Sequence, residues 1–385
     1  MTFSHSMTID VEGNRSSPEL VPRLMESSML LMLPGFVSAI INLLNSGRRR
    51  LPDVSTGLER SPWSPRDVSS ADESRPEPRL SVVIPVYNDP KGIRMTLESV
   101  TEQTYPAESY EVLAVDNGST DGTGEVIRAF ASFYDNVHLL VEDEVEGSYA
   151  ARNEGIEHAR GEIVSFVDAD MTVEEDWAES VVASHDRHGW DYMGAPVELY
   201  VEGGETLTAT YDRALGGFPV ERYMRERQFT GTGSLSIRRE VFDAVGTFDE
   251  RIVSQGDGEF GKRVAEAGFV QQFEPEITMY HAARTDLSAW LRKQVRIGRG
   301  AMQKRAYYPE RTEDAERTHP LHPRKFLPPK PWDFYRRLTA SAEPTPREVA
   351  GLYVIDYASK LARTWGGIAE WIDQSREGES PGGRP

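Results

Sequence analysis

Two aspartates stand where a buried strand is predicted to end. The apolar run at residues 163–167 leads directly into Asp168-Ala169-Asp170. Two carboxylates at the end of an apolar strand are costly unless a positive charge balances them. A divalent cation held by hard oxygens, itself bridging phosphate oxygens, would supply that balance. The alternative is a solvated turn, because Asp-x-Asp also occurs by chance in loops.

Two earlier apolar runs end in polar groups of a different kind. The run at 80–86 contains Pro85 and continues into Tyr87, and the run at 112–115 continues into Asp116. A tyrosine ring can stack on a flat base, and an aspartate can accept hydrogen bonds from a base N–H or a ribose hydroxyl. Residues 119–121 are expected to start the next helix rather than to contact a ligand.

These polar groups follow strands of one predicted sheet. Apolar, β-branched runs alternate with helix-period stretches: strands at 80–86, 112–115, 137–141 and 163–167, and helices at 92–102, 122–133, 149–159 and 174–185. Four such alternations predict an α/β fold with a mostly parallel, Rossmann-like sheet and helices on both faces. Ligands of such sheets bind outside the carboxyl ends of the strands, so the polar groups should share one edge.

The second half of the chain has a looser pattern. A strand is predicted at 234–237, and helices at 240–245, 257–267 and 287–308. A last helix carries an apolar stripe at steps of three and four: Val349, Leu352, Ile355, Ala358, Leu361, Trp365, Ile368 and Trp371. Docking on its own domain is the favoured interpretation, and contact with a second copy or a membrane is the alternative.

Residues 1–78 differ from the rest in being rich in Ser, Pro and Arg. Their one apolar run, 29–44, would span about 24 Å as a helix, less than the roughly 30 Å of a hydrocarbon core, and Pro34 and Gly35 interrupt it. The run therefore predicts an interfacial anchor, a packing helix or a disordered leader, in that order. We expect three parts: an N-terminal tail with a Pro-rich linker (1–78), an α/β domain (79–310) and a helical C-terminal extension (311–385).

Composition excludes several classes of function. A formal charge of -19 argues against nucleic-acid partners, which need basic surface. The absence of cysteine removes disulfides, thiolate metal sites and cysteine nucleophiles, so any metal must use oxygen or histidine. Lysine occurs only seven times, which indicates either a salt-adapted microbe or an acidic protein from a GC-rich genome.

Five motifs in order resemble those of family 2 glycosyltransferases, which have the GT-A fold. The resemblance covers about residues 80–300, and each motif is ambiguous alone. The motifs are Val83-Ile84-Pro85-Val86-Tyr87-Asn88, Val115-Asp116-Asn117-Gly118-Ser119-Thr120-Asp121, Ala151-Arg152-Asn153-Glu154-Gly155, Phe166-Val167-Asp168-Ala169-Asp170, and Arg238-Arg239 followed by Phe248-Asp249-Glu250.

The resemblance implies a nucleotide-sugar donor, with a UDP-sugar expected, and transfer with inversion at the sugar C1. Pro85, Tyr87 and Asp116 would hold the base and ribose, and Arg152 would add a contact near the base or phosphates. Asp168 would lie beside the ribose and the metal, while Asp170 would bind the cation, Mg²⁺ or Mn²⁺. That metal would stabilise the departing nucleotide diphosphate.

The resemblance also implies a catalytic base. The family has an acidic pair at the head of a helix, whose second acid takes the proton from the acceptor hydroxyl, and this acid corresponds to Asp257. The first acid is replaced by Gly256, which leaves Glu259 as a second candidate base. A helix-start acid favoured by the dipole is the alternative for Asp257.

Weaker signals come from four residues. His281 ends a predicted strand at 276–280, where related enzymes often complete the metal site with a histidine; a structural histidine is the alternative. Arg292, Arg296 and Arg299 recur at roughly helical spacing and are expected either to meet a diphosphate or to form a solvated basic face.

The leading hypothesis is a metal-dependent, inverting transferase that adds one sugar to a lipid-linked or membrane-proximal glycan acceptor. It would work in the cytoplasm, at the inner face of the cell membrane, in cell-surface glycan or glycoprotein assembly. The Gln-x-x-Arg-Trp signature of processive relatives is absent, which favours single-sugar transfer. Two alternatives stay open: a sugar nucleotidyltransferase, and an inactive nucleotide-sugar binding module.

Overall fold

The structure, a computed structural model, describes residues 77–312 and 319–378. These residues form two compact units, one comprising 77–312, 319–327 and 358–378, and the other comprising 328–357. The apolar run at 29–44 lies outside the described residues. Among those described, no helix is both long and apolar enough to cross a bilayer.

A seven-stranded sheet forms the centre of the larger unit, in the order β3-β2-β1-β4-β8-β6-β9. Only β8 runs against the other six strands, so the sheet is mostly parallel. The strands are β1 (Leu80–Val86), β2 (Tyr110–Asp116), β3 (Val137–Val141), β4 (Ile163–Phe166), β6 (Tyr192–Gly194), β8 (Leu235–Arg238) and β9 (Gln271–Phe273).

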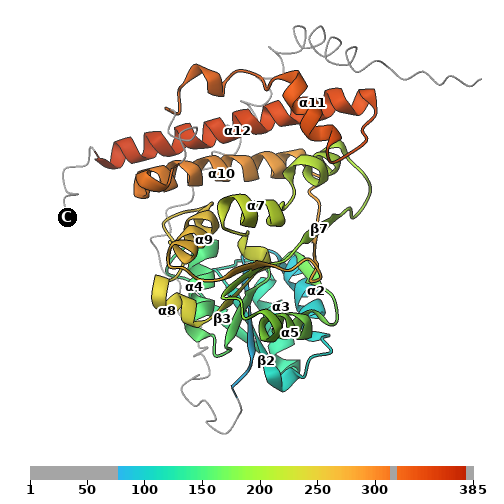
Figure 1. The fold of residues 1–385 in the computed structure, drawn as a ribbon, viewed down its shortest axis with the longest axis vertical. Coiled ribbons are helices and arrows are strands. Elements are labelled where there is room, and N and C mark those ends of the chain that lie inside the picture. Colours follow the sequence, from blue (N-terminus) through green and yellow to red (C-terminus); the bar gives the residue numbers. More distant parts are fainter. Residues whose placement is uncertain (1–76, 313–318, 379–385) are drawn as a thin grey trace, which may run out of the picture. The chain divides into compact units, whose positions relative to one another are not determined.

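Helices cover both faces of this sheet, as the alternation predicts. One face buries Val82 and Ile84 of β1 against α2 (Pro90–Thr101), α3 (Thr123–Phe133) and α5 (Trp177–His188). The other buries Val83 and Phe166 against α4 (Ser148–His158), α8 (Glu240–Val245) and α9 (Gly256–Glu266). Figure 1 shows the two helix sets on opposite sides of the sheet. Successive strand residues point to opposite faces, so a strand buried on both faces must be apolar throughout.

A second, three-stranded sheet has the order β5-β10-β7. Its strands are β5 (Met171–Val173), β7 (Val197–Tyr200) and β10 (Met279–Ala282). The strand expected at 276–280 is therefore displaced toward the C-terminus, and His281 lies inside β10 rather than after it.

Further helices complete the chain. The α-helices are α6 (Leu207–Tyr211), α7 (Val220–Arg227), α10 (Leu287–Tyr307), α11 (Pro331–Thr339) and α12 (Pro346–Gly378). Single turns lie at η1 (Ala107–Ser109), η3 (Thr232–Ser234), η4 (Pro309–Arg311) and η5 (Pro323–Lys325), with a π-helical turn at η2 (Asp212–Gly216).

The apolar stripe of α12 is largely buried. Its residues Leu352 and Ala358 are shielded from solvent, while Trp365 is partly exposed. In the larger unit α12 packs closely on α10, because a Cβ at Gly366 would lie 2.0 Å from the Val295 carbonyl oxygen. In the smaller unit Phe334 of α11 meets the Tyr353 ring edge-on at 5.2 Å.

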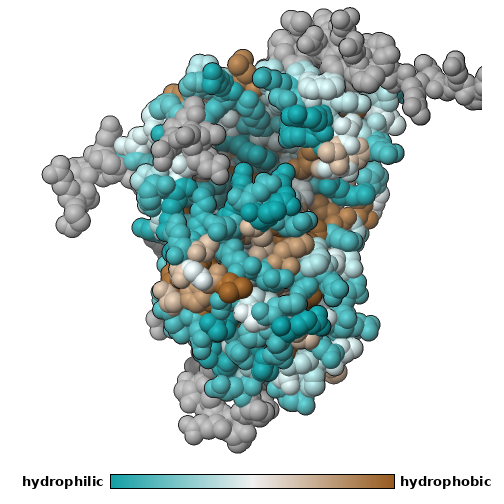
Figure 2. Space-filling model, viewed as in Figure 1, coloured by the Kyte–Doolittle hydropathy of each residue, from teal (hydrophilic) through white to brown (hydrophobic). Residues whose placement is uncertain are grey.

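Over the sheet and its flanking helices, the face drawn in the lower half of Figure 2 is dominated by hydrophilic side chains. Apolar side chains are instead concentrated in the two layers on either side of the sheet.

Candidate active site

The ends of β1 and β2 lie side by side. The strands are parallel with Val86 opposite Asp116, so the residues that follow them emerge at the same edge. Tyr87, which follows β1 directly, is 51% exposed. The buried Asp116 carboxylate accepts the Ser119 N–H at 2.9 Å.

Polar contacts hold the two loops together. Asn88 has a left-handed backbone (φ 51°), its N–H donates to Ser119 Oγ at 2.9 Å, and its side-chain oxygen accepts the Thr120 N–H at 2.8 Å. Asp121 accepts the Thr123 N–H at 2.9 Å, at the first turn of α3. The N-cap of α3 is Gly122 rather than a residue of 119–121, so Asp121 supports the helix start from the position before the cap.

Asp168 follows strand β4 and pairs with Arg152 of helix α4. The Arg152 guanidinium lies 2.5 Å from Asp168 Oδ1 and also donates to the Ser148 carbonyl. Arg152 is only 5% exposed, and its Nε has no hydrogen-bond partner within the described chain. A Cβ at Gly233 would lie 2.8 Å from the other carboxylate oxygen of Asp168. The loop through Gly233 therefore passes directly beside this carboxylate.

Asp170 is joined to His281 by the small sheet. His281 of β10 pairs with Met171 of β5, which places its Nε2 3.2 Å from Asp170 Oδ2. Its Nδ1 lies 2.6 Å from the Ala282 carbonyl oxygen, which can only accept, so Nδ1 carries a proton. Burial raises the pKa of the Asp170 carboxyl, but hydrogen bonding to His281 and its charge hold the pKa below the usual value.

The described residues contain no group of three or more His, Asp and Glu side chains gathered as a ready-made metal site. Asp170 and His281 form a pair, and Asp168 is engaged by Arg152. The structure therefore brings two of the three expected ligands into direct contact.

Asp257 stands in the first turn of α9. The residue before the helix, Gln255, has a left-handed backbone (φ 70°), which for a non-glycine residue is uncommon and often found at functional sites. Asp257 Oδ1 accepts the Gly258 N–H at 2.9 Å. Burial raises the pKa of the Asp257 carboxyl, outweighing this bond and the charges of Arg152 and Lys304.

The space beside Gly256 is filled by Tyr149. A Cβ at Gly256 would lie 2.8 Å from the Tyr149 ring, closer than real Cβ contacts allow. The Tyr149 hydroxyl accepts the backbone N–H of Asp257 at 3.1 Å, and its ring stacks on Phe248 at 5.6 Å. The glycine is thus a packing requirement of this tyrosine.

Glu259 is not brought to the cleft. It is almost fully buried, with Oε1 2.7 Å from Arg311 and Oε2 2.9 Å from Arg263. Asp257 and Glu259 are two residues apart on a helix, so they lie about 200° apart around its axis. The geometry therefore disfavours Glu259 as the second candidate base.

A cleft of about 480 Å³ unites several of these groups. It is lined by Tyr149, Arg152, Asp168 and Asp257, together with parts of α7, α10 and α12. The residues lining it do not include the other predicted site residues, namely Pro85, Tyr87, Asp116, Asp170, Glu259 and His281.

One face of α10 contributes to the cleft, but not as the arginine spacing suggests. Arg296 lines it, whereas Arg292 donates to Ser288 and Arg299 pairs with Asp373 at 3.0 Å. The missed residues are Tyr149 and a set of basic side chains that includes Lys262, Lys293 and Lys304. Three of the chain's seven lysines thus line one cleft. Because lysine is scarce in this sequence, the positions of its few lysines were the signal that could have indicated these residues.

Known proteins resemble this chain in sequence and in fold. Residues 81–248 match the family model described as Glycosyl transferase family 2. Glycosyltransferase AglE of Haloferax volcanii is 40% identical over 226 residues, which are 59% of this chain and 74% of that protein.

A second relative comes from Methanococcus voltae. It is a dolichyl N-acetyl-alpha-D-glucosaminyl phosphate 3-beta-D-2,3-diacetamido-2,3-dideoxy-beta-D-glucuronosyltransferase, 24% identical over 242 residues, covering 60% of this chain and 75% of that protein. Among solved structures, the mannosyltransferase PcManGT from Pyrobaculum calidifontis, in complex with GDP-Man and Mn²⁺, has a TM-score of 0.52 at 18% identity, covering 92% of this chain and 99% of that one. This likeness supports the GT-A fold.

Proposed function

Because the chain belongs to glycosyltransferase family 2, we propose that it moves a single sugar from a nucleoside diphosphate sugar to an acceptor hydroxyl, with inversion at the sugar C1. The observation that carries the proposal is that Asp168 and Asp257, 89 residues apart, line the same cleft. One lies at the end of a sheet strand, where donors of such folds bind, and the other lies in the first turn of a helix.

The donor nucleotide is assigned to the edge formed by β1 and β2. Tyr87 is exposed and is assigned to the base, and Asp116 is held by a backbone hydrogen bond beside it. Pro85 precedes them within β1. Arg152, buried against Asp168, is assigned to the region between the ribose and the phosphates.

The residues present fit a divalent cation at Asp170 and His281. Nε2 of His281 and Oδ2 of Asp170 lie 3.2 Å apart, and a bound cation would take the place of the proton that they share. The Nδ1 contact with the Ala282 carbonyl is the usual support of a metal-binding histidine, and it would leave the Nε2 lone pair for the cation. Asp170 and His281 would hold the metal, with Asp168 beside it. When bound, Mg²⁺ or Mn²⁺ supplies charge that stabilises the leaving diphosphate.

Asp257 is assigned as the general base. A sugar hydroxyl is a weak nucleophile, so a carboxylate within reach must accept its proton as the bond to C1 forms. The raised pKa of Asp257 makes it a better proton acceptor than an ordinary aspartate. Tyr149 and the Gly258 N–H hold this residue from two sides. With the base on one side of C1 and the diphosphate on the other, displacement is in line and inverts the configuration.

The acceptor is proposed to be a lipid-linked or membrane-proximal glycan in cell-surface glycan or glycoprotein assembly. The name of the Methanococcus voltae relative describes a dolichyl-phosphate-linked acceptor, which supports this assignment. We place the reaction in the cytoplasm at the inner face of the membrane, with residues 29–44 as the proposed lipid contact.

Donor binding and hydrolysis test the proposal. UDP- and GDP-sugars are incubated with Mn²⁺ or Mg²⁺, and release of the nucleoside diphosphate into water is measured. Calorimetry then compares the wild-type protein with Asp170→Ala, whose donor affinity should fall by roughly tenfold or more, to the level seen with chelator. No donor hydrolysis with any sugar would support the inactive binding module, and equal affinity with and without chelator would remove the metal assignment.

A further inference from the structure

The cleft beside Asp257 is strongly basic in a protein that carries a formal charge of -19. Its only acidic lining residues are Asp168 and Asp257. Its basic lining residues are Arg152, Arg222, Arg227, Lys262, Lys293, Arg296, Lys304 and Arg363. Basic side chains are therefore concentrated where the rest of the chain is acidic.

Five of these cations form no ion pair within residues 77–312 and 319–378: Arg222, Arg227, Lys262, Lys293 and Arg296. Elsewhere in the larger unit, Arg160 lies 2.7 Å from Glu111 and Arg251 lies 2.8 Å from Asp249. Some arginines outside the cleft also form no ion pair within the described residues, such as Arg292, which donates to Ser288. The cleft differs in gathering five such cations around one cavity.

Lys293 shows how poorly this charge is balanced. Its ammonium group lies over the rings of Phe218 and Trp290, at 5.5 and 5.3 Å from their centroids. Burial first, and then the charges of Arg284 and Arg296, lower the pKa of Lys293 to about 8, against the opposing effect of Asp212 and Asp170. A bound anion would favour the charged form of this lysine and offset the repulsion among its neighbours.

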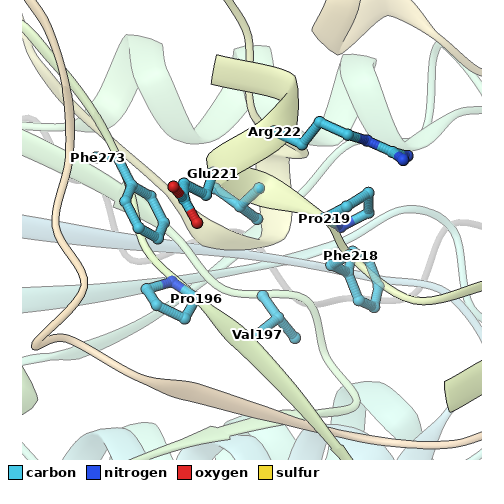
Figure 3. Close-up of a pocket in the computed structure, with 8 residues that line it drawn as sticks. Pro196, Val197, Phe218, Pro219, Glu221, Arg222 and Phe273 are labelled. Carbon is cyan, nitrogen blue, oxygen red and sulfur yellow. The ribbon is translucent and has the colours of Figure 1, made fainter. Parts of the chain in front are cut away.

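Arg222 points away from Glu221, its acidic neighbour on α7, so the two side chains do not form an ion pair. Figure 3 shows a smaller pocket of about 260 Å³, in which Glu221 points toward Phe273 and Pro196 while Arg222 extends the other way, past Pro219 and Phe218. Glu221 is paired with Arg225 instead, at 3.5 Å. Arg222 is therefore available to a ligand of the larger cleft, which it also lines.

These cations lie on other elements than the donor-side residues of the same cleft, which are Arg152 on α4 and Asp168 after β4. They come from α7, α9 and α10, and they share the cleft with Asp257, the proposed base. Tyr87 and Asp116, which are assigned to the nucleotide, do not line this cleft. A group bound beside the base belongs to the acceptor, because the base takes its proton from the acceptor hydroxyl.

We propose that Arg222, Arg227, Lys262, Lys293 and Arg296 form a subsite for an anionic group of the acceptor, a phosphate or a carboxylate attached to the glycan. The proposal rests on the proposed transferase function. Guanidinium and ammonium groups bind both anions through charge-assisted hydrogen bonds, and arginine does so with two parallel contacts. A neutral glycan would offer these cations no charge-assisted hydrogen bond.

The test compares three matched ligands: octyl glucoside (neutral), octyl glucosyl phosphate (phosphate) and octyl glucuronide (carboxylate). Binding is measured by calorimetry at low salt with Mn²⁺ and with UDP or GDP, whichever raises the melting temperature, so that the donor side is occupied. We expect at least one anionic ligand to bind roughly tenfold or more tightly than the neutral one. The anionic ligand that binds more tightly identifies the charged group of the acceptor as a phosphate or a carboxylate.

Variants on two elements supply the second arm. Arg222→Gln combined with Lys262→Gln should remove most of the preference for the anionic ligand. Arg225→Gln is the matched control on the same helix, because Arg225 is exposed, pairs with Glu221 and Glu226, and does not line the cleft. Equal or undetectable binding of all three ligands, or an unchanged preference in the double variant, would overturn the subsite. Donor hydrolysis by the wild-type protein is measured separately, so that failure of the transferase proposal can be distinguished from failure of the anion subsite.

Discussion

At the scale of single residues, two aspartates of one cleft have different partners. Asp168 is paired with the Arg152 guanidinium at 2.5 Å. Asp257 forms no such close ion pair within the described residues, and burial at a helix start raises its pKa. A carboxylate that is not engaged by a cation, and whose pKa is raised, is suited to accept a proton. This contrast is why we assign proton transfer to Asp257 and not to Asp168.

Asp257→Asn should therefore lower transfer by roughly 10² to 10⁴ while donor affinity stays within a few-fold, because an amide keeps the shape but cannot accept the proton. The measurement is kcat for transfer alongside calorimetric donor binding. Glu259→Gln is the control: it should lower the melting temperature, since Glu259 pairs with Arg263 and Arg311, yet keep transfer per folded molecule. If Glu259→Gln abolished transfer and Asp257→Asn did not, the general base would be Glu259 and not Asp257.

The pH dependence of transfer should report the same group. Only the carboxylate form of Asp257 can accept a proton, so activity falls as the pH drops through its pKa. Burial raises that pKa, so the acidic limb of kcat should lie above the roughly 3.9 of an ordinary aspartate. Arg152, Lys304 and the Tyr149 hydroxyl face the same group. A limb at or below that ordinary value would contradict the assignment.

Two glycines of α9 provide a matched pair for the Tyr149 contact. Gly256→Ala should destabilise the fold by about 1–3 kcal/mol and lower transfer, because its Cβ would meet the Tyr149 ring at 2.8 Å. Gly258→Ala should be tolerated, since its Cβ would lie 3.7 Å from Phe229, an ordinary contact. Thermal unfolding and transfer rate are measured for both. Equal changes in stability and transfer rate in the two variants would show that Tyr149 does not require a glycine at position 256.

At the scale of elements, the small sheet positions the proposed metal pair. The pairing of β10 with β5 sets His281 opposite Met171, the residue after Asp170. His281 is therefore positioned by a strand, which holds its side chain more rigidly than a loop would. The proposed nucleotide edge depends in the same way on the parallel register of β1 and β2.

The packing of α12 on α10 also rests on glycine. Gly366→Ala should lower stability by about 1–3 kcal/mol, because its Cβ would lie 2.0 Å from the Val295 carbonyl oxygen, and backbone cannot move aside cheaply. Gly367→Ala is the control on the same helix: its nearest contact is 3.5 Å, and alanine favours helix by up to about 1 kcal/mol. Denaturant unfolding measures both. A stability loss from Gly367→Ala equal to that from Gly366→Ala would contradict close packing at this crossing.

At the scale of the whole molecule, charge is distributed unevenly. The chain is acidic overall, yet its proposed acceptor cleft is lined by eight basic and two acidic side chains. A basic cleft in an acidic protein attracts anions locally while the remaining surface repels them. This distribution favours anionic groups that reach the cleft over polyanions that would cover the surface.

Membrane contact is also a property of the whole chain. The apolar run at 29–44, which lies outside the described residues, is the proposed lipid contact, so removing residues 1–50 should release the protein from liposomes and leave donor hydrolysis intact. Flotation and hydrolysis assays measure the two effects. If the truncated protein still floats, the partly exposed Trp365 of α12 becomes the next residue to test.

Much of the fold was accessible from the amino-acid sequence. The predicted limits of β1, β3 and α8 match the structure, and those of β2, β4, α2, α3, α4, α9 and α10 differ by a few residues at most. Strands buried on both faces must be apolar throughout, and amphipathic helices must repeat apolar residues every three or four positions. The order of residues along the chain therefore predicts these elements. The chemistry-bearing groups at 85–88, 116–121 and 168–170 were visible because each follows such a strand.

The tertiary structure alone decided which distant groups meet. Strand β5 of the small sheet has three residues, too few for an alternating pattern, so the sheet that carries His281 could not be foreseen. Nothing local in the sequence pairs Tyr149 with Gly256, opposes His281 to Asp170, or gathers lysines 262, 293 and 304 around one cleft. The first two contacts join segments about a hundred residues apart, where packing of the whole chain, and not the periodicity of any segment, selects the partner.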